Sequence, residues 1–259
     1  MGLLFGLLRG VQSSGAAFNP ADLFTGVRTG WLRYPNAADS VFQLADGTTA
    51  ATADGDPVGY VKDFGPGEWH LTNSNTPTKG VLRVDAGGIR SVEINNSASS
   101  KRVYATGSHV AVTGSFTWYI ACKTPSSAAG GLYGVASDDA SLTDPVFLYP
   151  SAGDLSLRAK GTIYSQGAIS IAADTPYILK MVYNSTSGEV TYGVVGGASA
   201  TVSASPVFMT ETSTLFWGSD GGSQTSRVAF DQFINAVLTE QETTDLETWL
   251  TDNIGTWAG

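Results

Sequence analysis

The segment Pro176–Gly197 constrains the fold most, because it has the pattern of a complete antiparallel hairpin. Apolar residues alternate with polar ones on both sides, as in strands that bury one face. The alternating large residues are Leu179, Met181 and Tyr183 on the way in and Val190, Tyr192 and Val194 on the way out. The "NSTSG" between the two runs supplies residues that favour a turn. This segment predicts an antiparallel β-protein.

The same pattern recurs along most of the chain. We expect hairpins in "GVLRVDAGGIRSVEINN" and "PVFLYPSAGDLSLRAKG", and strands in "GWLRYP", "SVFQLADGTT", "DPVGYVKDFG", "SFTWYIACK", "STLFWGSDGG" and "SRVAFDQFINAVL". Among 259 residues, only 14% are charged and 31 are glycine, which is typical of short strands joined by tight turns. A hydrophobic content of 42% is enough for a real core.

One helix is predicted near the C-terminus, in "LTEQETTDLETWL". Thr239 and Glu242 have the spacing of a capping box, which marks a helix start. Leu246, Trp249 and Leu250 then fall on one face at helical spacing and would pack on the strands. Many antiparallel strands with one late helix predict an all-β fold: an antiparallel β-sandwich, of the jelly-roll type, with one short C-terminal helix.

Residues 1–20 are predicted to form an extended N-terminal docking arm, and residues 21–259 a single sandwich in which 21–79 is the leading segment. The apolar side chains of the arm are Leu3, Leu4, Phe5, Leu7 and Leu8. This run is too short to span a bilayer, which takes about 20 apolar residues, and it lacks the positive start of a signal peptide. We expect the arm to dock on another chain; the alternative is an N-terminus folded back on its own domain.

Charge and cysteine content exclude several function classes. The net charge is −9 and the basic residues are scattered, so nucleic acids and anionic membrane surfaces are not expected partners. The single cysteine, Cys122, rules out an intrachain disulfide. By strand alternation Cys122 shares a face with Phe116, Trp118 and Ile120, which predicts an inert thiol in the core.

No catalytic residue is predicted. The two histidines, His70 and His109, lie in no recognisable catalytic setting, and there is no G-x-S-x-G elbow. None of the seven glutamates stands in the E-x-D-x-x-E pattern of hydrolases with this kind of sandwich. We therefore expect a protein that is not an enzyme and has no cofactor, calcium excepted.

The acidic stretch "TADGDPVGYVKD" admits two interpretations. Gly55 after Asp54 favours a turn with a positive φ, Pro57 fixes its exit, and the Asp side chains can accept backbone N–H bonds. The alternative is a calcium site, to which an Asp-x-Asp pair contributes only part of the six to eight oxygens required. We favour the turn.

A carbohydrate-binding site is the more plausible chemistry, because sugars are held by an exposed aromatic ring with nearby amides and carboxylates. The candidates are Trp69 with Glu68 and Asn73, Tyr133 with Asp138 and Asp139, and Trp217 with Asp220. Asp138 and Asp139 are also the candidates for calcium. The alternative for each aromatic residue is packing in the core or in a subunit contact.

Three segments carry a resemblance to a known family. "SFTWYIACK", "PYILKMVYNSTSGEVTYGVVGG" and "RVAFDQFINAVLTEQETTDLETWL" resemble the LamG-like, concanavalin A-like jelly roll. The positions that match its last strand and helix are Asp231, Phe233, Ile234, Leu238, Thr239 and Glu242. The resemblance covers roughly residues 80–250. It implies a sandwich fold and leaves function open, because this fold hosts lectins, hydrolases and inert modules.

A second resemblance lies in "SVFQLADGTTAATADGDPVGYVKD", which is similar to a segment preceding such sandwiches in virion proteins of tailed phages and in phage-derived gene-transfer particles. Phe42, Gln43, Gly47, Thr48, Thr49 and the run 52–59 agree. The usual continuation is replaced here by "DFGPGEWHLTNSN".

This resemblance implies a structural protein on the particle surface, as a head spike or decoration protein or as a tail or fibre component. Its partners would be other virion proteins through the arm, further copies in a homo-oligomer, and a host surface polysaccharide. The alternatives are an assembly protein without a ligand and a secreted carbohydrate-active enzyme.

Overall fold

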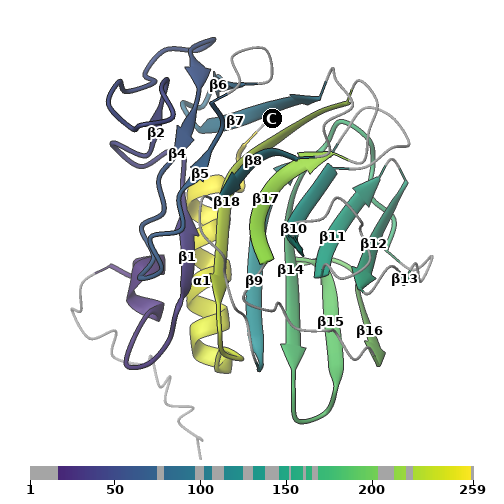
Figure 1. Ribbon diagram of the computed structural model, residues 1–259. Coiled ribbons are helices and arrows are strands. Elements are labelled where there is room, and N and C mark those ends of the chain that lie inside the picture. Colours follow the sequence, from purple (N-terminus) through teal and green to yellow (C-terminus); the bar gives the residue numbers. More distant parts are fainter. Residues whose placement is uncertain are drawn as a thin grey trace, which may run out of the picture.

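The computed structural model describes residues 17–74, 79–96, 102–106, 114–124, 131–137, 146–151, 153–159, 162–164, 169–203, 213–219 and 224–257. These residues form two nine-stranded sheets, in which every pairing of named strands is antiparallel (Figure 1). The fold is therefore a β-sandwich, as predicted. The predicted arm, apart from residues 17–20, lies outside the described residues, and with it Leu3, Leu4, Phe5, Leu7 and Leu8.

The first sheet has the order β16 (Ser199–Ser203), β15 (Glu189–Val194), β14 (Pro176–Asn184), β9 (Phe116–Lys123), β18 (Gln224–Ile234), β7 (Arg90–Asn96), β6 (Gly80–Val84) and β3 (Pro57–Val58), and β1 (Gly30–Arg33) also pairs with β18. The second sheet has the order β13 (Thr162–Tyr164), β12 (Asp154–Ala159), β11 (Val146–Ser151), β10 (Gly131–Ser137), β17 (Ser213–Ser219), β8 (Arg102–Thr106), β5 (Leu71–Thr72), β4 (Tyr60–Val61) and β2 (Val41–Phe42). A short 3-10 helix, η1 (Pro20–Leu23), and α1 (Glu240–Ile254) complete the described elements.

The predicted hairpin is present as β14 and β15. Its register places Leu179 opposite Val194, Met181 opposite Tyr192 and Tyr183 opposite Val190, so the predicted apolar faces coincide. All six side chains belong to the main core or pack against it. Alternation alone was sufficient to predict this register, because a slip by one residue would expose the whole apolar set.

Both faces of β9 are buried, which explains its unbroken burial pattern. Phe116, Trp118, Ile120 and Cys122 point into the space between the two sheets. Burial raises the pKa of the Cys122 thiol, so this cysteine stays uncharged. The prediction of a core thiol is confirmed.

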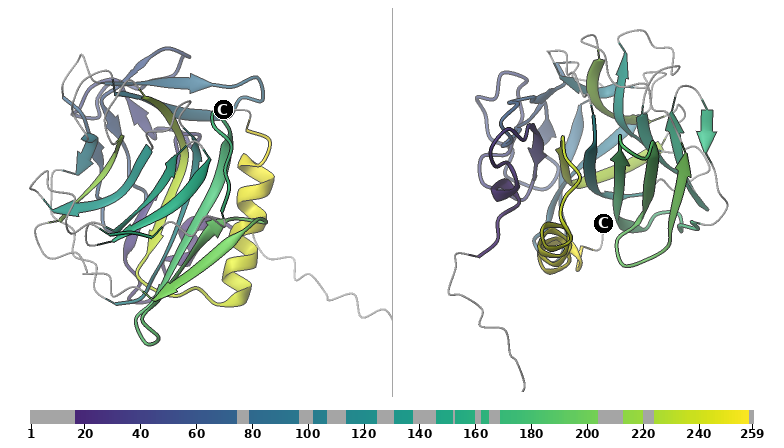
Figure 2. Two further views of the ribbon diagram at one scale, coloured as in Figure 1. Left: turned by 90° about the vertical axis from the view of Figure 1, so that its right-hand side faces the viewer. Right: turned by 90° about the horizontal axis from the view of Figure 1, so that it is seen from below.

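Helix α1 covers the outer face of the first sheet (Figure 2). Leu246 and Leu250 are fully buried against Tyr119 and Phe230 of that face. Thr239 and Glu242 exchange the two hydrogen bonds of a capping box, as predicted. None of the helices in the described part of the chain is long and apolar enough to cross a membrane.

The leading segment adds strands to both sheets. Strand β1 pairs with β18, and β3 pairs with β6, in the first sheet, while β5 pairs with β8 in the second. Gly30 is required in β1, because a Cβ there would lie 1.9 Å from the carbonyl oxygen of Phe233. Residues 21–74 therefore contribute strands to both sheets of the sandwich.

The segment "DPVGYVKDFG" was predicted as one strand, and this is wrong in detail. Val58 pairs with Gly80 in the first sheet, whereas Tyr60 pairs with Phe42 and Thr72 in the second. The chain changes sheet at Gly59, where a Cβ would lie 2.7 Å from the carbonyl oxygen of Gln43. A glycine at such a close backbone approach marks a crossing point that alternation cannot detect.

Residues 52–56 of the acidic stretch form a turn, as we favoured, whereas Pro57–Val58 and Tyr60–Val61 lie in β3 and β4. Gly55 has φ +91°. One carboxylate oxygen of Asp56 accepts the backbone N–H groups of Thr52 and Ala53, and Asp54 accepts that of Val84. Among the described residues no group of three or more His, Cys, Asp or Glu side chains is arranged to hold a metal ion.

Candidate carbohydrate-binding surface

The predicted binding residues fall in different settings. Trp217 is 1% exposed, and its Nε1 donates to Asp231 at 2.9 Å, so the prediction that it forms an exposed platform is wrong. Tyr133 lies in β10, opposite Trp217 and Leu148. Asp138, Asp139 and Asp220 lie outside the described residues, so their predicted roles stay predictions.

The burial of Trp217 follows from one carboxylate, that of Asp231. The Asp231 oxygens accept hydrogen bonds from the indole N–H groups of Trp31, Trp118 and Trp217 at 2.7–2.9 Å. They also accept one from Arg33 Nη1 at 2.8 Å. The carboxylate is fully surrounded by donors, so it supports the core and is not available to a substrate.

A second buried carboxylate, that of Asp63, organises the loop after β4. Asp63 accepts backbone N–H bonds from Leu32 and Gly65 at 2.7 Å and from Trp69 at 2.8 Å. Its own N–H donates to Nδ1 of His70 at 3.0 Å. One side chain therefore ties the loop, at Gly65 and Trp69, to Leu32 of β1, and Trp69 has a fixed position.

Of the predicted aromatic candidates whose side chains the structure describes, Trp217 is fully buried and Trp69 is half-buried. The ring of Trp69 meets the buried Trp31 edge to face, with the centroids 6.2 Å apart. Its carbonyl oxygen accepts a hydrogen bond from Arg33 Nη2 at 2.6 Å. The neighbouring Glu68 is exposed and has φ +49°, which sharpens the turn that carries the ring.

A row of further rings lies beside this loop. Phe42 and Tyr60 have centroids 5.6 Å apart, and Tyr60 and His70 5.1 Å apart. Burial lowers the pKa of His70, and its Nδ1 accepts a hydrogen bond, so the imidazole is neutral with its proton on Nε2. Burial and the nearby carboxylates of Asp63 and Glu68 raise the pKa of Tyr60, which stays a neutral hydroxyl.

We call Tyr60, Glu68, Trp69 and His70 the Trp69 surface. It combines an aromatic ring with a carboxylate, a phenol hydroxyl and an imidazole. Gly67 packs against the Trp69 indole, so the remaining part of the ring is what a sugar can stack on, with the exposed carboxylate of Glu68 next to it in the chain. Asn73 was also predicted to take part, but its side chain is buried, so it is not part of this surface. Its backbone N–H donates to the carbonyl oxygen of Gly59.

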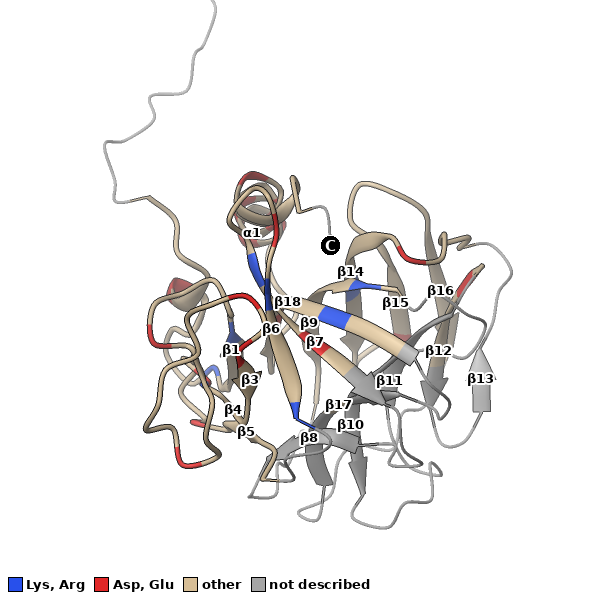
Figure 3. Ribbon diagram, turned by 90° about the horizontal axis from the view of Figure 1, so that it is seen from above, with Lys and Arg blue, Asp and Glu red and all other residues tan. Residues whose placement is uncertain are grey.

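Three glutamates that a hydrolase could use are engaged elsewhere. Glu93 of β7 is paired with Arg83 of β6 at 2.7 Å and with Arg227 of β18 at 2.9 Å. Figure 3 shows the charged positions of these three neighbouring strands. Glu242 is paired with Arg28, and Glu247 with Lys180 and the hydroxyl of Tyr119. These carboxylates join elements of the fold to one another.

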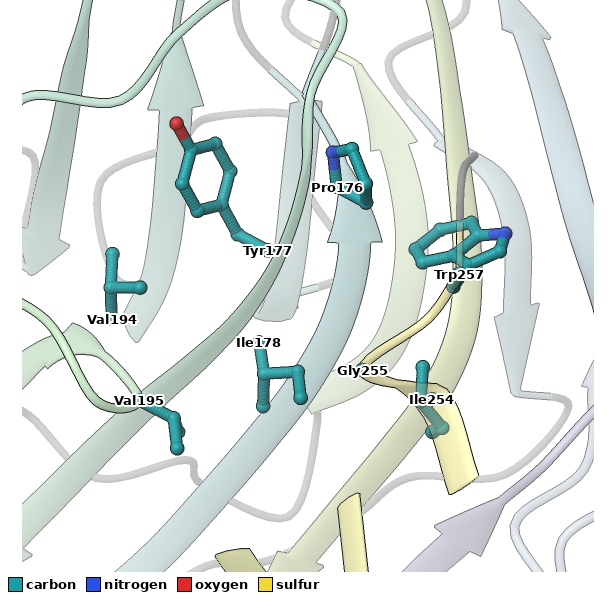
Figure 4. Close-up of a pocket in the computed structure, with 8 residues that line it drawn as sticks. All are labelled: Pro176, Tyr177, Ile178, Val194, Val195, Ile254, Gly255 and Trp257. Carbon is teal, nitrogen blue, oxygen red and sulfur yellow. The ribbon is translucent and has the colours of Figure 1, made fainter. Parts of the chain in front are cut away.

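Hollows of the surface lie around helix α1. The largest of those near α1, of about 460 Å³, is lined by Ala17, Phe18, Asn19, Pro20, Ala21, Leu32, Tyr34, Ala37, Phe64, Phe230 and Trp249. A second, of about 400 Å³, is lined by Ala17, Phe18, Asp245, Thr248, Trp249, Asp252 and Asn253. A third, of about 210 Å³, lies at the C-terminal end of α1 between Ile178, Ile254 and Trp257 (Figure 4). All three are distinct from the Trp69 surface.

Solved structures with the same fold include binding domains of botulinum neurotoxin DC and of Paraclostridial Mosquitocidal Protein 1. One structure is of botulinum neurotoxin type C, a toxin whose cell entry is described as dependent upon interaction with two ganglioside molecules. It is 10% identical, with a TM-score of 0.54, and the alignment covers 86% of this chain and 51% of that one. The binding domain of botulinum neurotoxin DC in complex with rat synaptotagmin II is 10% identical, with a TM-score of 0.55, and the alignment covers 86% of this chain and 52% of that one. The binding domain of Paraclostridial Mosquitocidal Protein 1 is 12% identical, with a TM-score of 0.55, and the alignment covers 87% of this chain and 52% of that one.

These likenesses show the fold alone, because the identities are only 10–12%. The chain spans about half the length of these structures. No protein-family model matches the sequence, and no curated protein matches it. The resemblances to LamG-like domains and to phage virion proteins therefore stay predictions.

Proposed function

We propose that this chain is a non-catalytic, carbohydrate-binding module, displayed by a phage or phage-like particle. The observation that carries the binding role is the half-buried Trp69 ring, held on a rigid loop beside the exposed Glu68. A ring that is already fixed loses little conformational entropy when a ligand stacks on it. Structures of the same fold that serve as binding domains support a binding role over a catalytic one.

The particle role is supported by the sequence resemblance in residues 41–59. Residues 17–20 pack on the chain's own sandwich, so in this proposal residues 1–16 attach the chain to other virion proteins, and several copies present their sandwiches to the host surface. A single Trp69 surface is small, so the affinity of one copy for a glycan is low. Display of many copies on one particle raises the overall avidity without any new contact.

An assembly protein without a ligand is the second candidate function. It requires Trp69, Tyr133 and Trp217 all to be buried, in the sandwich or in contacts between subunits. Trp217 is buried and Trp69 is half-buried, so the burial of Trp217 favours this candidate and the exposure of Trp69 favours the binding module.

A glycan array probed with the chain in multivalent form tests the binding role. We expect Trp69→Ala to reduce the retained signal by about tenfold or more, which corresponds to about 1.4 kcal/mol. Phe64→Ala is the matched control, because Phe64 lies on the same loop and is 36% exposed but lines the hollow near α1. No signal from the unaltered chain, or an equal signal from Trp69→Ala, would count against the binding module.

Labelling of intact particles with an antibody against the sandwich tests the location separately. We expect label at regular positions on the particle surface. Particles that carry no label would contradict the virion role and leave the glycan result unaffected.

A further inference from the structure

The hollow of about 460 Å³ is the most aromatic part of the described surface around α1. Tyr34 and Trp249 have ring centroids 5.2 Å apart, and Phe230 lies 6.1 Å from Tyr34 and 5.7 Å from Trp249. Phe64, at the rim, is 36% exposed. Apolar side chains placed in this hollow would remove apolar surface from water.

The described part of the chain begins at this hollow. Ala17 and Phe18 line both the apolar hollow and the neighbouring one that contains Asp245 and Asp252. Sixteen residues, 1–16, precede this point. An extended chain spans at most about 3.3–3.6 Å per residue, so residues 3–8 can reach any part of the hollow.

The composition of these residues matches the two hollows. Leu3, Leu4, Phe5, Leu7 and Leu8 are apolar, and Arg9 follows them directly. The apolar hollow would cover the apolar side chains. The second hollow, which shares Ala17, Phe18 and Trp249 with the first, offers the carboxylates of Asp245 and Asp252 to the guanidinium of Arg9.

We propose that in the free chain residues 3–8 occupy the apolar hollow of their own chain, with Arg9 beside Asp245 and Asp252. The chain's own segment is favoured over that of a second copy, because covalent linkage through only a few residues gives an effective concentration of about the millimolar range. This inference does not depend on glycan binding. Attachment to a particle through the same residues then requires their release from the hollow, so the hollow keeps the segment covered until a partner takes it.

Disulfide trapping in the full chain tests this placement. We expect Leu7→Cys combined with Ala37→Cys to form a disulfide within one chain under mild oxidation, because Ala37 lines the hollow. The native Cys122 is buried and does not compete. The matched control is Leu7→Cys combined with Ser187→Cys, since Ser187 is exposed in the β14–β15 turn, away from the hollow. Disulfide-linked dimers would assign the hollow to a second copy, and the absence of any disulfide would overturn the proposal.

Dye binding provides a second test, because the two arrangements of residues 3–8 predict opposite changes in dye fluorescence. If residues 3–8 fill the hollow, Leu4→Asp with Leu7→Asp opens it, and the fluorescence of an apolar dye such as anilinonaphthalene sulfonate rises. If these residues lie free in solution, the same two substitutions remove exposed apolar surface and the signal falls or stays equal, which would contradict the proposal. Arg9→Glu is expected to slow the trapping of Leu7→Cys by Ala37→Cys at low salt, because it repels Asp245 and Asp252.

Discussion

Asp231 shows how one residue can decide the packing of a core. Its carboxylate accepts hydrogen bonds from three of the six tryptophans and from Arg33, and both charged side chains are at most 2% exposed. The four donors come from three strands, since Trp31 and Arg33 belong to β1, Trp118 to β9 and Trp217 to β17. The pair of sheets is thus joined through a single buried anion, which is stable only because every oxygen is saturated with donors.

We expect Asp231→Asn to lower the free energy of unfolding by about 3–5 kcal/mol, because it leaves the Arg33 guanidinium buried without its counter-ion. An Asn amide also places an N–H group among indole N–H donors. Urea unfolding followed by tryptophan fluorescence measures the change. Glu240→Gln, at an exposed position of α1, is the control and should change stability by less than about 0.5 kcal/mol. A stability of Asp231→Asn equal to that of the control would refute this account.

The sequence predicts some of these residues and misses others for a physical reason. Trp118 is placed in the core by its alternation with Phe116 and Ile120, which is a local signal. Trp217 was predicted to be an exposed platform. The local sequence gives no sign of its burial, because Asp231 and Tyr133 come to lie next to it only when the strands assemble. Asp63 was predicted in a turn, but its contact with Leu32 spans 31 residues and has no local signature.

At the scale of elements, α1 is the best-predicted one. Its capping box and buried face follow directly from the spacing of Thr239, Glu242, Leu246 and Leu250. Its connection to the leading segment could not be predicted, because Arg28 reaches Glu242 over 214 positions of sequence. Arg28 Nη1 lies 2.5 Å from the Oε1 of Glu242, and its Nη2 lies 3.0 Å from Oε2. The pair ties the start of α1 to the loop before β1.

This pair makes stability depend on pH in a defined window. The Arg28 guanidinium, with help from Thr239, lowers the pKa of Glu242 to about 2. A lowered pKa means that the stabilisation is fully present above the unfolded value of about 4.3 and is lost as the pH falls toward 2. We expect Glu242→Gln to cost about 1–2 kcal/mol at pH 6, since the pair is partly screened by solvent, and close to nothing near pH 2.

Chemical unfolding of both proteins from pH 6 to pH 2 measures this difference. Glu240→Gln is the control, because it removes a charge from the same turn and leaves the pair with Arg28 intact. A difference between Glu242→Gln and the unaltered chain that stays constant over the whole range would show that the ion pair is not its cause.

At the scale of the whole molecule, the leading segment and the later strands form one framework. Residues before position 75 contribute β1 and β3 to one sheet and β2, β4 and β5 to the other. Figure 1 shows these short strands beside the long ones that follow them in the chain. A module built in this way presents the Trp69 surface on the framework itself, so a ligand bound there would be held by the whole sandwich.

The last prediction concerns the cooperativity of this framework. Leu71 of β5 is fully buried in the main core, between the leading segment and β8. We expect Leu71→Ala to lower the free energy of unfolding by about 2–5 kcal/mol, through lost burial and a residual cavity. Because β5 belongs to the same cooperative unit as the rest, calorimetry should show one transition at a lower temperature, with equal calorimetric and van't Hoff enthalpies. Val237→Ala, at a side chain that is 41% exposed, should leave the transition almost unchanged. Two transitions, of which only the lower one moves in Leu71→Ala, would show that residues 21–79 unfold as a separate unit.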